Sequence, residues 1–290
     1  MNPPTRRPVR RGTLVVILAS LAVLSGACDA RAQDSAPLKR YALDDAAAVR
    51  HPLPGALREV SGLAATADGR LFAHGDERAE IFEIDPRSGG VLKRFSLGQR
   101  TLTGDFEGIA VAGERFFLVT SGATIVEFRE GADRESVAYT DVRTRLDDCE
   151  EIEGLEHEAQ AHVLLLVCKI AARGALIIYE FDLASMSMRA RPRIRIEPDA
   201  LRSAGLETLR PSGLAMSQAG TLLVVAAREQ RLVELSARGD ILGVRGLATR
   251  AHPQAEGIAV LPDGTIVIAD EGGNGRGMLT LYHPRAPRDQ

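Results

Sequence analysis

A short phrase ending in glycine recurs five times along this chain, and it restricts the possible folds more than any other feature. The segments are EVSGLAA, DFEGIAV, EIEGLEH, RPSGLAM and QAEGIAV, with their glycines at Gly62, Gly108, Gly154, Gly213 and Gly257. The intervals between these glycines are 46, 46, 59 and 44 residues. Recurrence at such a period is typical of folds in which each copy forms one supersecondary unit, such as the blade of a propeller.

Each phrase is followed by further short apolar runs, separated by polar turns. After Gly257, for example, come TIVIAD and MLTLYH, and some units add a fourth run, as at 91–97 and 243–247. The runs are about five residues long, rich in β-branched residues and bounded by Gly and Asp, which indicates strands rather than helices. Asp-Gly pairs at 68–69 and 263–264 suit hairpin turns, because glycine readily adopts positive φ.

We therefore predict an all-β fold: a five-bladed β-propeller of four-stranded blades, forming a single domain over residues 33–290, with six blades as the lesser alternative. A β-sandwich would not need five copies of one phrase. The last unit has only three strands, so we expect an N-terminal strand, LKRYALD at 38–44, to complete it, close the ring and hide two sheet edges. The 59-residue interval predicts an insertion around 185–208, with a short helix within 199–209.

The first 32 residues have the pattern of an export signal. Four arginines precede an apolar run from Leu14 to Leu24, which is shorter than the about 20 residues needed to span a bilayer. Cleavage within LSGAC would remove residues 1–27 and leave Cys28 for lipidation, whereas ARA at 30–32 would end an ordinary signal peptide, 1–32. The sequence thus predicts an exported, periplasmic protein, soluble or anchored to a membrane only through Cys28.

Removing the leader makes the chain clearly acidic. Its four charged residues before Cys28 are all arginines, so the formal net charge changes from −3 to −7. No basic patch stands out, which argues against a nucleic-acid partner. Excess acid suits a chain that holds cations.

Cysteine usage fits an oxidising compartment. Apart from Cys28, the chain contains only Cys149 and Cys168, an even pair. In the third unit, strands over 152–157 and 162–168 would bring position 149 roughly opposite 169–170, so we predict a disulfide that pins this hairpin. The alternative is two separate buried thiols.

The residue before each repeat glycine defines a ring of candidate site residues. In a propeller the first strand of each blade lines the central channel, so these positions meet around one mouth. They read Ser61, Glu107, Glu153, Ser212 and Glu256, and two positions earlier stand Glu59, Asp105, Glu151, Arg210 and Gln254. Three glutamates that converge either have raised pKa values or hold a cation. Calcium suits them, because it takes six to eight oxygen ligands in loose geometry.

The end of the second strand lies beside the start of the first and supplies a second ring. We expect the charged residues there to surround the glutamate cluster at the channel mouth: Asp76, Lys169, Arg228, Asp270 and Glu271. Alternatively, the glutamates form only a structural salt-bridge network with Lys169 or Arg228. His74 and His252 fall near the mouth but read better as structural residues than as ligands. Ser61, Ser121 and Ser212 lack the G-x-S-x-G context of a serine nucleophile.

The phrases EVSGLA, DFEGIAV, EIEGLE and QAEGIAVLPDGTIVIADEGG resemble the SdiA-regulated (YjiK-like) family of exported bacterial propellers, which is distantly similar to NHL-repeat propellers. The resemblance spans about residues 53–285. It implies a five-bladed propeller with a bound calcium ion, and Glu107, Glu153 and Glu256 match the Glu-Gly positions of the motif. Ser61 and Ser212 depart from it, which puts the full ligand set in doubt.

Three functional hypotheses follow. The first is an exported, monomeric calcium-binding propeller that binds an unidentified small molecule or protein at its channel mouth without catalysis. The second is a calcium-dependent hydrolase, of lactonase, esterase or phytase type, with the metal as Lewis acid and Asp76, His74 or Glu271 as base candidates. Only analogy between folds supports this alternative. The third is a structural scaffold without an ion.

Overall fold

A computed structural model of the chain describes Met1, residues 37–43 and residues 48–285. The predicted leader, with Cys28 and both cleavage sites, lies outside the described residues, so the domain start at residue 33 remains a prediction. No helix in the described part of the chain is long and apolar enough to cross a membrane.

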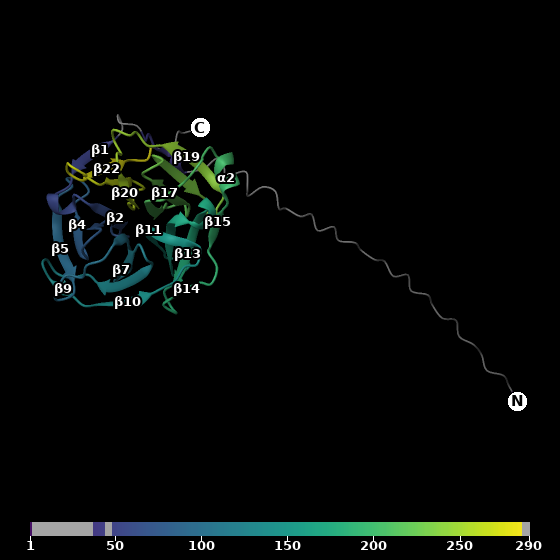
Figure 1. Cartoon of the computed structure of the whole chain (residues 1–290), viewed down its shortest axis with the longest axis horizontal. Coiled ribbons are helices and arrows are strands. Elements are labelled where there is room, and N and C mark those ends of the chain that lie inside the picture. The colour runs from purple at the N-terminus through teal and green to yellow at the C-terminus, as the bar shows by residue number, and fades with distance from the viewer. Residues whose placement is uncertain (2–36, 44–47, 286–290) are drawn as a thin grey trace. The chain divides into compact units, whose positions relative to one another are not determined.

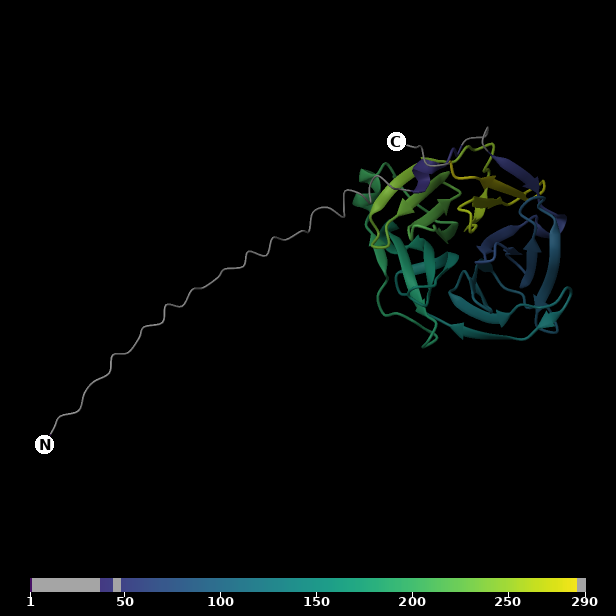
Figure 2. The same ribbon diagram turned by 180° about the vertical axis from the view of Figure 1, so that it is seen from behind.

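Five sheets, antiparallel apart from one short parallel pairing, stand around a central channel (Figures 1 and 2). Each sheet is one blade, and its first strand lies at the channel. This arrangement confirms the predicted five-bladed all-β propeller, and the six-bladed alternative is wrong. We number the blades I to V in the order of their repeat glycines.

The first two blades follow each other directly in sequence. Blade I comprises β2 (Val60–Ala65), β3 (Leu71–Gly75), β4 (Glu80–Ile84) and β5 (Val91–Leu97). The short β9 (Ser136–Val137) pairs with β5 in parallel. Blade II comprises β6 (Phe106–Ala112), β7 (Arg115–Thr120), β8 (Thr124–Arg129) and β10 (Tyr139–Arg143).

Blade III contains the longest strands and the expected insertion. It comprises β11 (Cys149–Glu158), β12 (Val163–Ala171), β13 (Leu176–Asp182), β14 (Ser187–Met188) and β15 (Ile194–Ile196), with η3 (Ala172–Gly174) between β12 and β13. β14 and β15 both pair with β13. The helix expected within 199–209 is α2 (Pro198–Ser203), shorter than the segment proposed for it.

Blade IV is regular, and blade V is composite. Blade IV comprises β16 (Gly213–Met216), β17 (Leu222–Ala226), β18 (Arg231–Leu235) and β19 (Ile241–Gly246). Blade V comprises β20 (Ala255–Val260), β21 (Ile266–Asp270) and β22 (Met278–Tyr282), and its outer strand is β1 (Val49–Pro52) from the other end of the chain. A short η2 (Gly55–Leu57) then leads into blade I.

The ring is closed by an N-terminal strand, as predicted, but by a different segment. Within the proposed 38–44, residues Pro37–Arg40 form the 3₁₀ helix η1, and β1 provides the strand instead. The reason lies in the apolar spacing. Leu38, Tyr41 and Leu43 are all buried against blades IV and V, but they stand three and two residues apart, and a strand with alternating faces cannot bury all three on one side.

The described core consists of one apolar cluster between each pair of neighbouring blades. Between blades I and II, for example, the rings of Phe72 and Phe116 meet edge to face with their centroids 4.9 Å apart, a favoured aromatic geometry. The predicted Asp-Gly turns are also present, with φ of +88° at Gly69 and +86° at Gly264. The blades thus hold the inner strands in a fixed ring around the channel.

Candidate functional site

The five repeat glycines form the narrowest part of the channel. A Cβ added to any of them would lie less than 3.0 Å from a neighbouring atom, and at Gly108 the obstacle is the backbone nitrogen of Leu155, 2.7 Å away. The space inside the ring is only about 10 Å³, roughly the room for one water molecule. This packing confirms that the glycine is the architectural part of the repeat. It also closes the base of the cavity above it.

The residue before the glycine is the extra residue of a β-bulge in three blades. The register of β2–β3 shifts between Val60 and Gly62, and the same shift skips Glu107 in β6 and Glu256 in β20. A bulge bends its strand and re-aims the unpaired side chain. The bulges thus explain why Ser61, Glu107 and Glu256 face the channel mouth rather than a blade interface.

The glutamates open into a cavity of about 200 Å³ at the mouth of the channel. Its lining brings together Glu59, Val60, Ser61, Asp76, Glu107, Glu153, Lys169, Gln254, Glu256 and Glu271. Nine residues named from the sequence therefore share one site: the three pre-glycine glutamates with Glu59, Ser61, Asp76, Lys169, Gln254 and Glu271. Lys169 is the only basic residue in this lining.

Glu153 is the most buried of the three glutamates and is already paired. Its side chain is 5% exposed, and Lys169 Nζ donates a hydrogen bond to its Oε1. The same ammonium lies 3.5 Å from Glu151 Oε1. Burial raises the pKa of the Glu153 carboxyl, and Lys169 counteracts that rise. Burial would lower the pKa of Lys169, but its bond to Glu153 and the surrounding carboxylates raise it.

Among the described residues, Glu107 has a hydroxyl donor but no cationic partner. Ser61 Oγ donates to Glu107 Oε2 over 3.0 Å. Burial, with the nearby charge of Glu153, raises the pKa of Glu107 to about 9. Asp105 lies outside the cavity lining, where its carboxylate accepts a hydrogen bond from Ser121 Oγ at 2.5 Å. Its charge still contributes to the raised pKa of Glu107.

Glu256 has no direct partner, although the charge of Lys169 partly offsets the rise in its pKa. In the described part of the chain its carboxylate has no hydrogen bond or ion pair with another side chain. Burial, together with the charge of Glu153, raises its pKa to about 8. Next to it, Gln254 Nε2 donates to Glu271 Oε2. The pKa of Glu271 is raised by burial and by the charges of Asp76 and Glu59.

Two residues of the predicted second ring lie elsewhere, because Arg228 in blade IV and Asp270 in blade V each stand one position away from the one that faces the cavity. Gly62 pairs with His74, Gly213 with Val225 and Gly257 with Ala269. The residues two positions after these partners, at the channel mouth, are Asp76, Ala227 and Glu271. Arg228 is therefore one position too late and is exposed, and Asp270 is one too early and is 1% exposed. Neither lines the cavity.

Asp270 belongs to a buried network that the sequence did not reveal. It accepts a hydrogen bond at Oδ2 from His252 Nδ1 over 2.8 Å, and His252 Nε2 lies 2.7 Å from the hydroxyl of Tyr282. All three side chains are buried. This supports the interpretation of His252 as a structural residue of blade V.

His74 and Ser212 are also packed between blades. His74 takes the place that Val119, Val167 and Val225 occupy in other blades. Its Nδ1 lies 2.9 Å from the carbonyl of Gly75, its Nε2 has no partner among the described residues, and burial lowers its pKa to about 4. Ser212 Oγ donates to the carbonyl of Ala255 over 2.6 Å. A ligand role for either would need the blades to separate.

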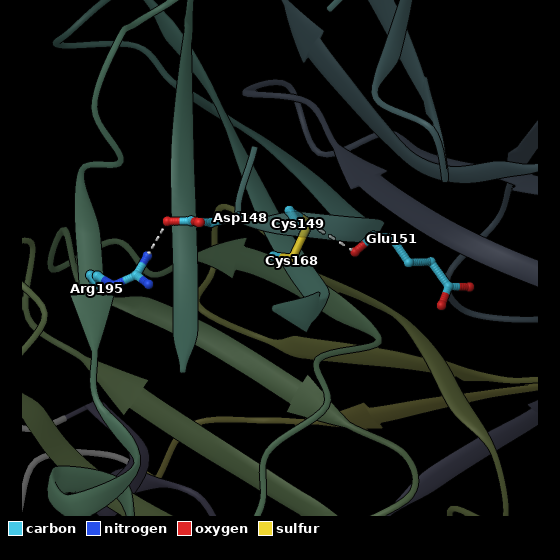
Figure 3. Close-up of a disulfide and its surroundings, with 5 residues drawn as sticks. All are labelled: Asp148, Cys149, Glu151, Cys168 and Arg195. Atoms are coloured by element: carbon cyan, nitrogen blue, oxygen red, sulfur yellow. Dashed lines mark hydrogen bonds and ion pairs between the residues drawn. A yellow bond between two sulfur atoms is a disulfide. The ribbon is translucent and has the colours of Figure 1, made fainter. Parts of the chain in front are cut away.

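The predicted disulfide is present (Figure 3), and its Cys168 directly precedes Lys169 of the cavity lining. It joins Cys149 to Cys168 with a Cα–Cα distance of 5.9 Å. Cys149 lies opposite Ala171, slightly beyond the expected 169–170, because the β11–β12 register shifts three times between Cys149 and Leu155. The bond therefore holds the two strands where their ladder is interrupted. It adjoins Glu151 on one strand and Lys169 on the other.

The donor chemistry of the cavity fits a hard cation, although the side chains are not yet gathered around one. Carboxylates, a hydroxyl and an amide oxygen are the ligands that calcium prefers. Across residues 37–43 and 48–285, however, no three His, Cys, Asp or Glu side chains are close enough to hold a metal ion as they stand. A cation would require the glutamates to turn toward one another.

Comparison with known proteins confirms the family resemblance over part of its predicted span. The sequence model of the SdiA-regulated family matches residues 188–281. A search of curated protein sequences finds no match.

Solved structures support the fold. The glutaminyl cyclase of Myxococcus xanthus superposes with a TM-score of 0.55 and 14% identity, over 82% of this chain and 96% of that one. A luciferin-regenerating enzyme gives a TM-score of 0.51 and 11% identity, over 81% of this chain and 95% of that one. These propellers include enzymes, but at such identities the likeness shows the fold alone.

Proposed function

We propose that this propeller binds a calcium ion in the carboxylate cavity and receives a ligand or protein partner at the same mouth. One observation carries the proposal: Glu107, Glu153 and Glu256, from equivalent positions of three blades, line one cavity closed at its base. Burial and mutual repulsion raise the pKa of Glu107 to about 9 and that of Glu256 to about 8. Neither of these two glutamates has an ion-pair partner among the described residues, and a divalent cation would supply the missing positive charge.

Calcium is the favoured ion because of the ligands and their spacing. The cavity offers oxygen donors and no cysteine or histidine suited to zinc. Calcium accepts six to eight oxygens in irregular geometry, whereas magnesium requires a near-ideal octahedron at shorter distances. A roomy cavity of about 200 Å³ with donors from several blades meets the first requirement better than the second.

Calcium titration of chelator-treated protein tests this proposal. An ion that binds only the folded state raises the melting temperature in a concentration-dependent way. We expect Glu107→Gln and Glu256→Gln to abolish most of that rise. Glu207→Gln is the matched control, because Glu207 is an exposed glutamate outside the cavity lining. No shift in the wild type with calcium would contradict the proposal.

We favour binding over catalysis. Of the base candidates for a hydrolase, His74 is sealed between blades I and II, while Asp76 and Glu271 do line the cavity. Nothing else in the site singles out a nucleophile or an oxyanion donor. A panel of lactones, aryl esters and phosphoesters tests this choice. Turnover that is lost with chelator and in Glu107→Gln would contradict a purely binding role.

We also propose that the chain is exported and acts as a monomer. The leader pattern supports export, and so does the pairing of Cys149 with Cys168, since disulfides persist in oxidising compartments. Cell fractionation with palmitate labelling decides between the two cleavage sites. Label that disappears in Cys28→Ala would establish the lipid anchor, and unlabelled periplasmic protein would favour cleavage after Ala32.

A further inference from the structure

The carboxylate cavity already contains one cation, which is the ammonium of Lys169. Its Nζ donates to Glu153 and lies 3.5 Å from Glu151, and its charge also acts on Glu256. Lys169 is about one-third exposed, so solvent reaches it and its long side chain has room to leave. The cluster thus holds a positive charge supplied by the chain itself.

Blade III is the only blade that places a basic residue here. The equivalent positions in the other blades are Asp76, Ser121, Ala227 and Glu271, which are acidic or neutral. The position of Lys169 is also well fixed, because the preceding residue is Cys168 of the disulfide (Figure 3). A tethered ammonium held this way has a high effective concentration at Glu153.

We infer that Lys169 is a built-in competitor of the bound cation and sets the affinity and charge selectivity of the cavity. This inference rests on the proposed function of the site. While Lys169 is in place, it holds the carboxylate of Glu153 and leaves only Glu107 and Glu256 without a cationic partner. A cation that is to be ligated by all three glutamates must displace the ammonium.

This competition favours divalent over monovalent ions. If a monovalent cation from solution replaces the ammonium of Lys169, the Coulomb energy does not improve, and the entropy of the immobilised ion is lost. Exchanging the ammonium for a doubly charged ion roughly doubles the attraction to the same carboxylates. The ligand class that Lys169 selects is therefore a divalent cation, and sodium or potassium is rejected.

Substitution of Lys169 tests the inference. We expect calcium to bind Lys169→Met at least about tenfold more tightly than the wild type, because a repelling charge a few ångströms from the ion is removed. Lys169→Arg keeps the charge and should stay within about threefold of the wild type on the same Coulomb argument. Lys39→Met is the matched control, since it removes one exposed lysine outside the cavity lining. Isothermal titration calorimetry on the full folded domain gives the affinities.

The monovalent arm uses the same variants. With sodium chloride replaced by choline chloride at equal ionic strength, the calcium affinity of the wild type should not change. That of Lys169→Met should be weaker in sodium, because sodium then competes for the opened site. Equal affinities of the variant in both salts would overturn the selectivity claim.

The outcomes separate this inference from the proposed function. A wild type that binds no calcium, with a Lys169→Met variant that does, would refute the function and support the inference. Calcium binding of equal strength by the wild type and by Lys169→Met would support the proposed function and refute the inference. Binding by neither refutes both. If Lys169→Met does not fold, acetylation of the wild type replaces it: calcium should increase the modification of Lys169 relative to Lys39, and an unchanged ratio overturns the inference.

Discussion

At the cavity, blade III presents Glu153 paired with Lys169, whereas blade V presents Glu256 beside Glu271. The two blades start from the same EG phrase and place their glutamates equivalently. The residue that the second strand brings to the mouth, however, is Lys169 in blade III and Glu271 in blade V, which have opposite charges. Glu153 therefore has an ion-pair partner, whereas Glu256 has none and its nearest charged neighbours are mostly acidic. The repeat determines where a carboxylate stands, and the second strand determines whether it is neutralised.

The disulfide gives the largest expected difference between the two blades. Blade III depends on it, because the β11–β12 ladder is broken where it crosses, and blade V has no counterpart. The bond closes a loop of 19 residues, so its removal should cost about 3 kcal/mol. Chemical denaturation of the double variant Cys149→Ser, Cys168→Ser measures the loss. A loss of stability below about 1 kcal/mol would show that the backbone hydrogen bonds between β11 and β12 are enough to hold these strands together at the channel mouth.

The repeat glycines should behave alike in the two blades, in contrast to the carboxylates. A Cβ at Gly154 would lie 3.0 Å from the backbone nitrogen of Leu214, and one at Gly257 would lie 3.2 Å from the backbone of Gly62. Substitution of either by Ala should therefore destabilise the fold by about 2 kcal/mol. Gly122→Ala, where nothing lies within 4 Å, is the control in the same denaturation assay. If Gly154→Ala or Gly257→Ala left stability unchanged, the inner strands would have to be able to move apart and make room for a methyl group.

The pH dependence of stability should come from Glu107 and Glu256, which have no ion-pair partner among the described residues. Glu107 and Glu256 have pKa values of about 9 and 8 in the folded protein, against 4.5 for a glutamate in the unfolded chain. Between these limits the folded state therefore holds more protons than the unfolded state. The free energy of unfolding should therefore fall as pH rises from about 5 to 9, by about 1–2 kcal/mol after allowance for solvent screening. Thermal melts without metal measure the fall. A flat profile, or one that calcium leaves unchanged, would contradict it.

The smallest effects should have opposite signs. At pH 8 without metal, Glu256→Gln removes an uncompensated carboxylate and should stabilise the protein by about 1 kcal/mol. Glu153→Gln removes the partner of Lys169 and should destabilise it by a similar amount, roughly 1 kcal/mol, because Lys169 is partly solvated. Paired denaturation curves compare them. If both substitutions changed the stability in the same direction, the two carboxylates would share one electrostatic environment.

The sequence predicts positions that follow the repeat and misses those that depend on single residues. The five glycines were enough for the blade number, the strands and the three glutamates at the mouth. Arg228 and Asp270 each miss the cavity by one residue, because the end of the second strand has no marker as strict as the glycine. The closing strand was misplaced for a related reason. Apolar residues at 38, 41 and 43 signal burial, but they do not say whether a strand or a turn buries them.

The partners of the glutamates could not be read from the sequence either. Ser61 contacts Glu107 across 46 residues, and Lys169 reaches Glu153 from the other strand of its hairpin. Both contacts depend on bulges that turn the side chains into the channel. A bulge is a local deviation in pairing, and no residue type in these segments marks it.

The composite fifth blade ties the two ends of the chain into one sheet, where Pro52 pairs with Met278. During synthesis the first of these segments leaves the ribosome long before the second exists, so blades I to IV can form while the ring is still an open arc. Closure by such distant contacts is slow in folding terms. Until it occurs, the carboxylates stand on a horseshoe with a gap between blades IV and I, so a cation site that needs three converging blades cannot exist before the last strands arrive.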